Sequence, residues 1–179
     1  IFYLLFLEKF MKNLKITNLS DKDIENINEL YNHYISETAF TFDIKEKKYE
    51  EKKEWAKTFS NEGPHQCLVA YENDNLIGFV SSRPFREKEA YFSSVETSIY
   101  IDQSYIGNGY GQDLMKELLK RITKFGVIRA YAFITKPNEM SEKLHNSIGF
   151  KHIGTLNNVG KKFEKYWDVG VFELSLPIK

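Results

Sequence analysis

The spacing of apolar residues along the chain predicts a succession of helices and strands. After Ser20, apolar side chains recur at intervals of three and four residues, the spacing that places them on one buried helix face. Ser20 followed by Asp23 is typical of a helix N-cap with an acidic residue three positions on. A helix is therefore expected after Ser20, and a short strand before it at residues 14–17. The buried helix face consists of Ile24, Ile27, Leu30, Tyr31, Tyr34 and Ile35.

Two runs with the composition of β-strands follow a Gly63-Pro64 break. They are CLVAYE and LIGFVSSRPF, and the Asn73-Asp74-Asn75 segment between them predicts a turn that pairs them antiparallel. A longer strand is expected at residues 91–101, then a glycine-rich loop, then another helix. The apolar face of that helix consists of Leu114, Met115, Leu118, Leu119 and Ile122.

The remaining segments complete a mixed domain of helices and strands. Alternation of the two kinds of element along one chain favours an α/β fold built on a single central sheet. The expected elements are an exposed helix over the charged residues 45–57, a strand at 127–134, a helix at 137–147 ended by Gly149, and final strands near 151–156 and 163–176.

The composition is that of one folded domain. The chain has 179 residues, of which 42% are hydrophobic and 15% aromatic, enough for one well-filled core. Residues 1–10, IFYLLFLEKF, differ from the rest and are interpreted as an N-terminal extension to a single domain at residues 11–179. Their apolar run is too short to span a bilayer and lacks the basic leader of a secretory signal.

Charge and cysteine content narrow the class of partner. Twenty-five basic and 25 acidic residues cancel, and no long block of one sign would suit nucleic acid or an acidic membrane, so a small-molecule partner is expected. Cys67 is the only cysteine, which excludes an intrachain disulfide and indicates a reducing, cytoplasmic location. The sequence shows neither a catalytic triad nor clustered metal ligands, so neither a hydrolase nor a bound metal is expected.

The glycine loop at residues 106–111, IGNGYG, lies between a predicted strand and a predicted helix. Its backbone N–H groups and the helix N-terminus can face a phosphate without Cβ atoms in the way. The loop contains neither GxGxxG nor a lysine-containing P-loop motif. Taken alone, the pattern fits a structural turn as well as a phosphate-binding loop.

The longer segment ETSIYIDQSYIGNGYGQDLMKELL resembles the acyl-CoA signature of the GNAT acetyltransferase superfamily. More narrowly, the chain is similar to phosphinothricin acetyltransferase-like enzymes through YNHYISETAFTF, RPFREKEAYFSSVETSIYI, TKPNEMSEKLHNSIGF and KYWDVGVFEL. The resemblance covers nearly everything after Met11. It implies a GNAT fold, with helices flanking a mostly antiparallel sheet whose middle strands splay apart. It also implies a homodimer that transfers acetyl from acetyl-CoA to the amine of a small amino-acid-like acceptor.

The resemblance also implies where acetyl-CoA binds. Its pantetheine arm would lie along a strand and its pyrophosphate on the glycine loop, although Ile106 stands where the family usually has Gln or Arg. Asn138 matches a family asparagine that contacts CoA, while on residue type alone it is as well explained as the first residue of a helix. The other implied contacts are Ile99, Tyr100 and Ile101 on the strand and Gly107, Asn108, Gly109, Tyr110, Gly111 and Gln112 in the loop.

Four further residues are candidates for catalysis and acceptor binding. Glu96, within an apolar strand, matches a family glutamate and is the candidate general base; by itself it could be an outward-facing carboxylate. His145 is the candidate acid, with the two roles exchangeable, or else a packed side chain. Arg86 and Lys88 lie where related enzymes carry arginines that meet acidic groups of the acceptor, but they could equally be solvated loop charges.

Other functions stay open at this point. Polyamines, aminoglycosides and protein N-termini are alternative acceptors, since the balanced charge disfavours none of them. A non-catalytic acyl-CoA-binding module is an alternative of a different kind, which the unusual Ile106 encourages.

Overall fold

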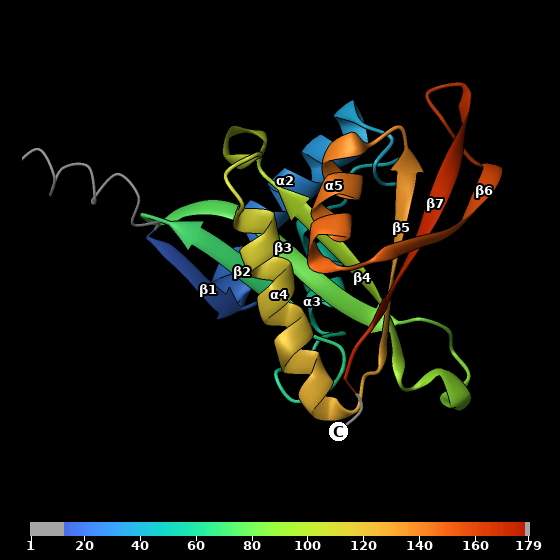
Figure 1. The fold of residues 1–179 in the computed structure, drawn as a ribbon. Coiled ribbons are helices and arrows are strands. Elements are labelled where there is room, and N and C mark those ends of the chain that lie inside the picture. The colour runs from blue at the N-terminus through green and yellow to red at the C-terminus, as the bar shows by residue number, and fades with distance from the viewer. Residues whose placement is uncertain (1–12, 178–179) are drawn as a thin grey trace, which may run out of the picture.

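The computed structural model describes residues 13–177, and the extension predicted at residues 1–10 lies outside them. One seven-stranded sheet has the order β1-β2-β3-β4-β5-β7-β6 (Figure 1). Its strands are β1 (Leu14–Asn18), β2 (Cys67–Glu72), β3 (Asn75–Pro84), β4 (Ser94–Ile101), β5 (Arg129–Lys136), β6 (Lys151–Lys162) and β7 (Lys165–Ser175). The helices are α2 (Ile24–Glu37), α3 (Tyr49–Ala56), α4 (Tyr110–Ile122) and α5 (Glu139–Ile148), with short 3-10 turns η1 (Asp21–Asp23), η2 (Glu89–Tyr91), η3 (Gln103–Tyr105) and η4 (Thr123–Phe125).

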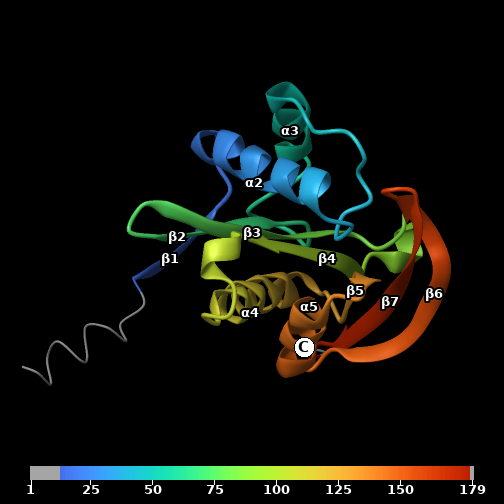
Figure 2. The ribbon, with the colours of Figure 1, turned by 90° about the horizontal axis from the view of Figure 1, so that it is seen from above.

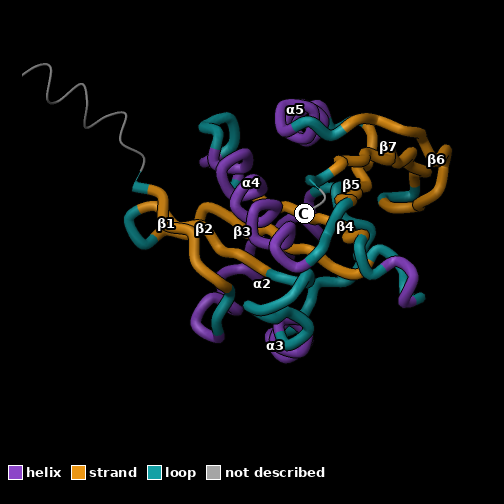
Figure 3. The backbone as a smooth tube through the Cα atoms, turned by 60° about the horizontal axis from the view of Figure 1, so that its bottom comes forward, coloured by secondary structure: helices purple, strands orange, loops and turns teal. Residues whose placement is uncertain are grey.

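Helices cover both faces of the sheet. Figures 2 and 3 show α2 and α3 on one face and α4 and α5 on the other. The larger core cluster joins the apolar face of α4, including Leu114 and Leu118, to the sheet. A second cluster joins Ile27 and Leu30 of α2 to the opposite face, around Phe79. None of the helices within residues 13–177 has the length and apolar character needed to cross a membrane.

The sheet opens at its centre. Every strand pair is antiparallel except β4 with β5, which run parallel and pair only through Ser94–Glu96 and Arg129–Tyr131. β4 continues to Ile101 and β5 to Lys136 without further pairing between them. The expected α/β GNAT architecture, a mostly antiparallel sheet with splayed middle strands between helices, is confirmed.

Local sequence signals explain two of the predicted features. The Ser20 amide and hydroxyl both donate to the Asp23 carboxylate, at 2.8 and 2.6 Å, which caps the start of the first helical segment. Asn73 and Asp74 have positive φ angles of 48° and 67°, as the tight turn of the β2–β3 hairpin requires.

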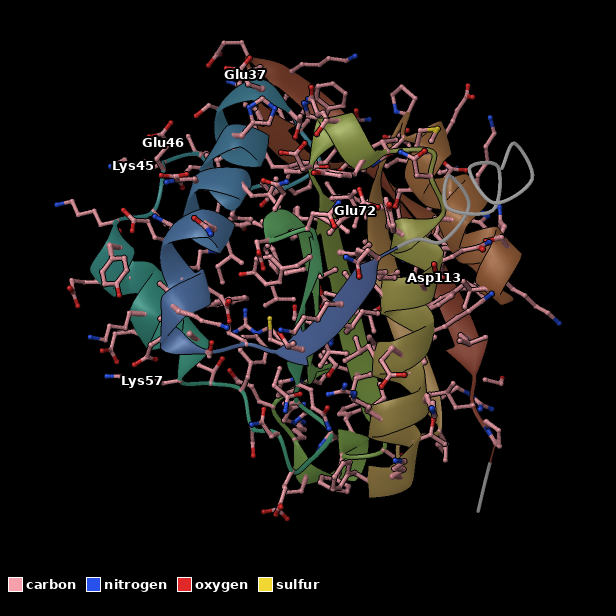
Figure 4. The ribbon with its side chains drawn as sticks, turned by 90° about the vertical axis from the view of Figure 1, so that its left-hand side faces the viewer. Glu37, Lys45, Glu46, Lys57, Glu72 and Asp113 are labelled. Carbon is pink, nitrogen blue, oxygen red and sulfur yellow. The ribbon has the colours of Figure 1, made fainter. Side chains whose placement is uncertain are left out.

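The helix predicted over residues 45–57 is wrong in its first part, because α3 begins only at Tyr49. The Asn32 side chain binds the backbone of Lys47 instead. The Lys47 N–H donates to Asn32 Oδ1 at 2.7 Å, and Asn32 Nδ2 donates to the Lys47 carbonyl at 2.9 Å. These bonds fold residues 38–48, here called the strap, back along α2. In Figure 4, Glu37 marks the end of α2, and Lys45 and Glu46 lie beside that helix.

Other element boundaries also differ from the prediction. β4 begins at Ser94 because Glu89–Tyr91 form a 3-10 turn, and α5 begins at Glu139 because Asn138 is its N-cap. The last two strands form one long hairpin, in which β6 extends to Lys162.

Candidate active site

A cavity of about 720 Å³ lies where β4 and β5 diverge, and α4 and α5 contribute to its walls. Most of the residues predicted to bind acetyl-CoA line it, and so does the catalytic candidate His145. Glu96, Arg86, Lys88 and Asn108 are not among the lining residues. The predicted residues that do line the cavity are Ile99, Tyr100, Ile101, Gly107, Gly109, Tyr110, Gly111, Gln112, Asn138 and His145.

The glycine loop has the geometry of an anion-binding turn. Gly107 and Gly109 have φ angles of 87° and 81°, a left-handed conformation that side chains rarely adopt. A Cβ on Gly107 would meet open space, so it is the backbone conformation that favours glycine at this position. Gly109 is also the N-cap of α4, whose first N–H groups and positive dipole end favour a negative charge. These features fit the pyrophosphate of a CoA molecule.

Hydrogen bonds fix the surroundings of this loop. The Tyr110 hydroxyl donates to the Glu72 carboxylate at the end of β2, a residue labelled in Figure 4. The Gln112 amide donates to the Ser147 hydroxyl, which links α4 to α5 across the cavity. Ile106 is exposed and also lines the cavity. The loop is thus held through neighbouring positions although Ile106 supplies no hydrogen-bonding side chain.

The main chain of β4 presents unpaired groups to the opening. Asp102 N–H donates to Ile77 C=O at 2.8 Å, which fixes the alternation of the antiparallel β3–β4 ladder. By that alternation the backbone of Tyr100 hydrogen-bonds to β3. The backbone N–H groups of Ile99 and Ile101 point the other way, toward the side from which β5 has diverged. The Ile101 carbonyl already accepts from the Tyr34 hydroxyl at 2.6 Å. Two strand N–H groups therefore face the opening, and Tyr100 contributes its ring instead.

Asn138 caps α5 as well as lining the cavity. Its Oδ1 accepts from the Ser141 N–H at 3.2 Å, in agreement with the alternative that Asn138 begins a helix. The side-chain NH₂ group is the part of Asn138 that remains available for a ligand.

His145 is buried and held in one tautomer. Its Nδ1 lies 2.8 Å from the Ser141 carbonyl, which can only accept, so Nδ1 carries the proton and neutral Nε2 has a free lone pair. Nε2 is buried and has no hydrogen-bond partner among the described residues. Burial lowers the pKa of His145, and the bond to Ser141 only partly opposes this. The imidazole is therefore a neutral acceptor at pH 7.

Glu96 faces the other side of the sheet. Strand alternation gives it the orientation of Tyr100, which packs in the α2 cluster, whereas His145 packs against Phe150 and Phe172 on the α4 side. Half-burial raises the pKa of Glu96, and the nearby Arg83 and Arg86 act in the opposite direction. The two candidates for acid and base thus flank the opening from opposite faces.

The Arg86 and Lys88 side chains are exposed in the loop before β4. The Arg86 guanidinium lies over the Phe85 ring, 4.5 Å from its centroid, and is close enough to lower the pKa of Glu96. Lys88 is the N-cap of the 3-10 turn η2. Arg86 therefore lies close enough to Glu96 to affect its pKa, whereas Lys88 is not among the charges that do so.

Several residues of the site escaped the sequence prediction. Arg83 on β3 lies opposite Glu96 on β4 in the register of the sheet. Tyr34, Phe40 and Phe133 line the cavity. Of these, only Arg83 had a local signal, since it begins the RPF segment, while the others reach the site through tertiary packing. Among residues 13–177, no group of three or more His, Cys, Asp or Glu side chains is placed to hold a metal ion.

The split sheet and its glycine loop define a GNAT acetyltransferase, and the model of the Acetyltransferase (GNAT) domain family matches residues 16–171. The phosphinothricin N-acetyltransferase of Streptomyces coelicolor is 39% identical over 158 residues, covering 87% of this chain and 92% of the relative. The L-methionine sulfoximine/L-methionine sulfone acetyltransferase of Salmonella typhimurium is 28% identical, with 86% and 90% covered. Within the GNAT class, the chain therefore belongs to the phosphinothricin acetyltransferase-like family.

A solved structure agrees with this assignment. An acetyltransferase from Salmonella typhimurium, determined with its cofactor acetyl-CoA, superposes with a TM-score of 0.87 at 26% identity, covering 92% of this chain and 95% of that one. The present protein is accordingly an acetyl-CoA-dependent N-acetyltransferase.

Proposed function

We propose that the protein acetylates the amine of a small, anionic amino-acid analogue, of the phosphinothricin or methionine sulfoximine type. The observation that carries this is the place of Glu96 beside the β4–β5 opening, with Arg83 and Arg86 close enough to affect its pKa. A carboxylate can take a proton from an ammonium, and guanidinium groups can pair with an acidic acceptor. The phosphinothricin and methionine sulfoximine acetyltransferases to which the chain is similar support the same substrate class.

The first chemical task is to deprotonate the acceptor. An alkylamine with a pKa of about 10 is almost entirely protonated at pH 7, so it has no lone pair for attack on the thioester. Bound acetyl-CoA would supply an activated acyl group, and the glycine loop would hold its pyrophosphate. Glu96, as the base, takes the proton directly or through water, and its raised pKa makes it a better acceptor of that proton.

Two further groups of the chain complete the mechanism. The N–H groups of Ile99 and Ile101 face the opening, where they can stabilise negative charge that develops on the acyl oxygen. His145 has its proton on Nδ1 and a low pKa, which suits it to accept a hydrogen bond or a proton rather than to donate one. His145 is therefore better suited to take the second proton of the attacking amine than to act as the acid. When the carbon–sulfur bond breaks, CoA leaves as a thiolate, and the proton held by Glu96 can neutralise it directly or through water.

Transfer is direct rather than through an acyl-enzyme. Cys67 is buried in β2, and burial raises the pKa of its thiol, which disfavours the reactive thiolate. A thiol-release assay with amino acids and their phosphinate, sulfone and sulfoximine analogues tests the substrate class. Acetylation of polyamines or aminoglycosides with no activity on any amino-acid analogue would overturn it, and inertness toward every amine would indicate a non-catalytic module.

We also infer a homodimer that covers β6. This edge strand is exposed along most of its length and presents Ile153, Leu156 and Val159 to solvent. An exposed apolar edge strand is prone to pair with another chain unless a partner covers it. Analytical ultracentrifugation should give a dimer that Val159→Lys converts to monomer, and a monomeric wild-type protein would contradict the inference.

A further inference from the structure

The strap is tied to the β6–β7 hairpin far from it in sequence. Lys162 Nζ donates to the Thr41 carbonyl at 2.8 Å, although Lys162 is only 4% exposed. A Cβ on Gly160 would lie 2.2 Å from Cε2 of Phe42, so the strap packs directly against the hairpin backbone. In Figure 2 the hairpin curls toward the face of the sheet that carries α2.

Both sides of this contact are themselves fixed. The Trp167 indole N–H donates to the Lys162 carbonyl at 2.9 Å, which holds the lysine backbone in the hairpin. On the strap, the Thr41 hydroxyl lies 2.9 Å from the Tyr31 hydroxyl, and Tyr31 donates to Asp43 at 2.7 Å. The lysine therefore joins two ordered parts of the molecule and does not merely cover a loose loop.

A lysine is an expensive residue for this position. Burying an ammonium removes it from water, and burial lowers the pKa of Lys162 while Asp43 opposes the shift. An apolar side chain would pack at lower cost if the position needed only volume. What an apolar side chain cannot do is donate to the Thr41 carbonyl, so the benefit of lysine lies in fixing the strap.

The strap contributes to the wall of the cavity. Phe40 lines it together with Tyr34 and Tyr100, and these two tyrosines belong to the core cluster on the α2 side of the sheet. Glu96 faces the same side of the sheet by strand alternation. α4 and α5 lie on the other face of the sheet (Figure 2), and the glycine loop that would hold acetyl-CoA leads into α4. Phe40 is thus placed on the side from which an acceptor would reach Glu96.

We propose that Lys162 is a positioning residue, whose buried bond to Thr41 holds Phe40 in the acceptor wall of the cavity. The proposal rests on the proposed function, because it assumes that the acceptor approaches on the Glu96 side. Loss of this bond frees the strap and leaves the glycine loop intact. Affinity for the acceptor then falls, while affinity for acetyl-CoA does not.

Lys162→Met tests the proposal, because it keeps an unbranched side chain, one atom shorter, and removes the donor. The matched control is Lys161→Met, since Lys161 is exposed and pairs only with the exposed Glu164 among the described residues. Lys162→Met should raise the KM for the acceptor about tenfold, the scale of one hydrogen bond to a charged group, and leave the KM for acetyl-CoA nearly unchanged. Hydrogen–deuterium exchange over residues 38–48 should accelerate in Lys162→Met and not in the control.

Gly160→Ala gives a second route to the same displacement. The added methyl pushes Phe42 away and leaves Lys162 in place. The KM for the acceptor should again rise while the KM for acetyl-CoA stays nearly unchanged, even if Lys162→Met fails to fold. Unchanged exchange across the strap in both variants, or an equal rise in both KM values, would overturn the positioning role. A wild-type protein that acetylates no amino-acid analogue would instead overturn the proposed function, and the exchange data would still report on the strap.

Discussion

Glu96→Gln separates a catalytic carboxylate from a structural one. Glutamine keeps the size and much of the polarity of the side chain but cannot accept a proton at neutral pH. General bases typically contribute about 10²- to 10⁴-fold, which corresponds to about 2.7 to 5.4 kcal/mol in the barrier. A fall of kcat in this range is expected, with acetyl-CoA binding nearly intact, because Glu96 does not line the cavity.

The role of Glu96 as base also predicts how kcat/KM changes with pH. Burial raises the pKa of Glu96, and catalysis requires the carboxylate, so kcat/KM should fall as the pH drops through this raised pKa. Arg83 lowers the pKa of Glu96, so Arg83→Ala should move the acid limb of the profile to higher pH. In Glu96→Gln the limb itself should disappear.

Thiol release measured across pH, together with calorimetric titration of CoA, provides the assay. Glu87→Gln is the matched control, since Glu87 is an exposed carboxylate in the loop before β4. If Glu96→Gln were as active as the wild type at every pH, Glu96 would be a structural residue and the base would have to be found elsewhere, first at His145.

Three further substitutions test the rest of the site. Gly109→Val should raise the KM for acetyl-CoA strongly, because a branched residue is strained at a φ of 81°; unchanged CoA affinity in a folded variant would refute the loop assignment. His145→Ala should cost less kcat than Glu96→Gln, and a larger, pH-dependent loss in the same thiol-release assay would make His145 the principal base. Lys88→Ala should raise the KM for acidic acceptors more than for neutral amines, with equal effects contradicting a carboxylate-binding role.

The fold was largely predictable because its signals are local. The α2 and α4 faces follow from apolar periodicity, and the β2–β3 turn follows from Asn73 and Asp74. Residues 45–48, the last part of the strap, were mistaken for helix because their conformation depends on side chains of α2, such as Asn32, that bind their backbone. The role of Lys162 could not be predicted, since nothing in the sequence distinguishes a buried lysine that binds a distant carbonyl from a surface lysine.

The sequence predicted which residues form the site but not how they are arranged. In the structure they lie on two faces of the sheet. Alternation along β4 sends Glu96 and Tyr100 to the α2 side, while Ile99 and Ile101 pack toward α4. In a continuous sheet a base on one face could not act on a group held from the other. Pairing of β4 with β5 ends at Glu96, so the opening begins at the residue proposed as base. The divergence of the strands is therefore what would let Glu96 reach a thioester held from the side of the glycine loop and His145.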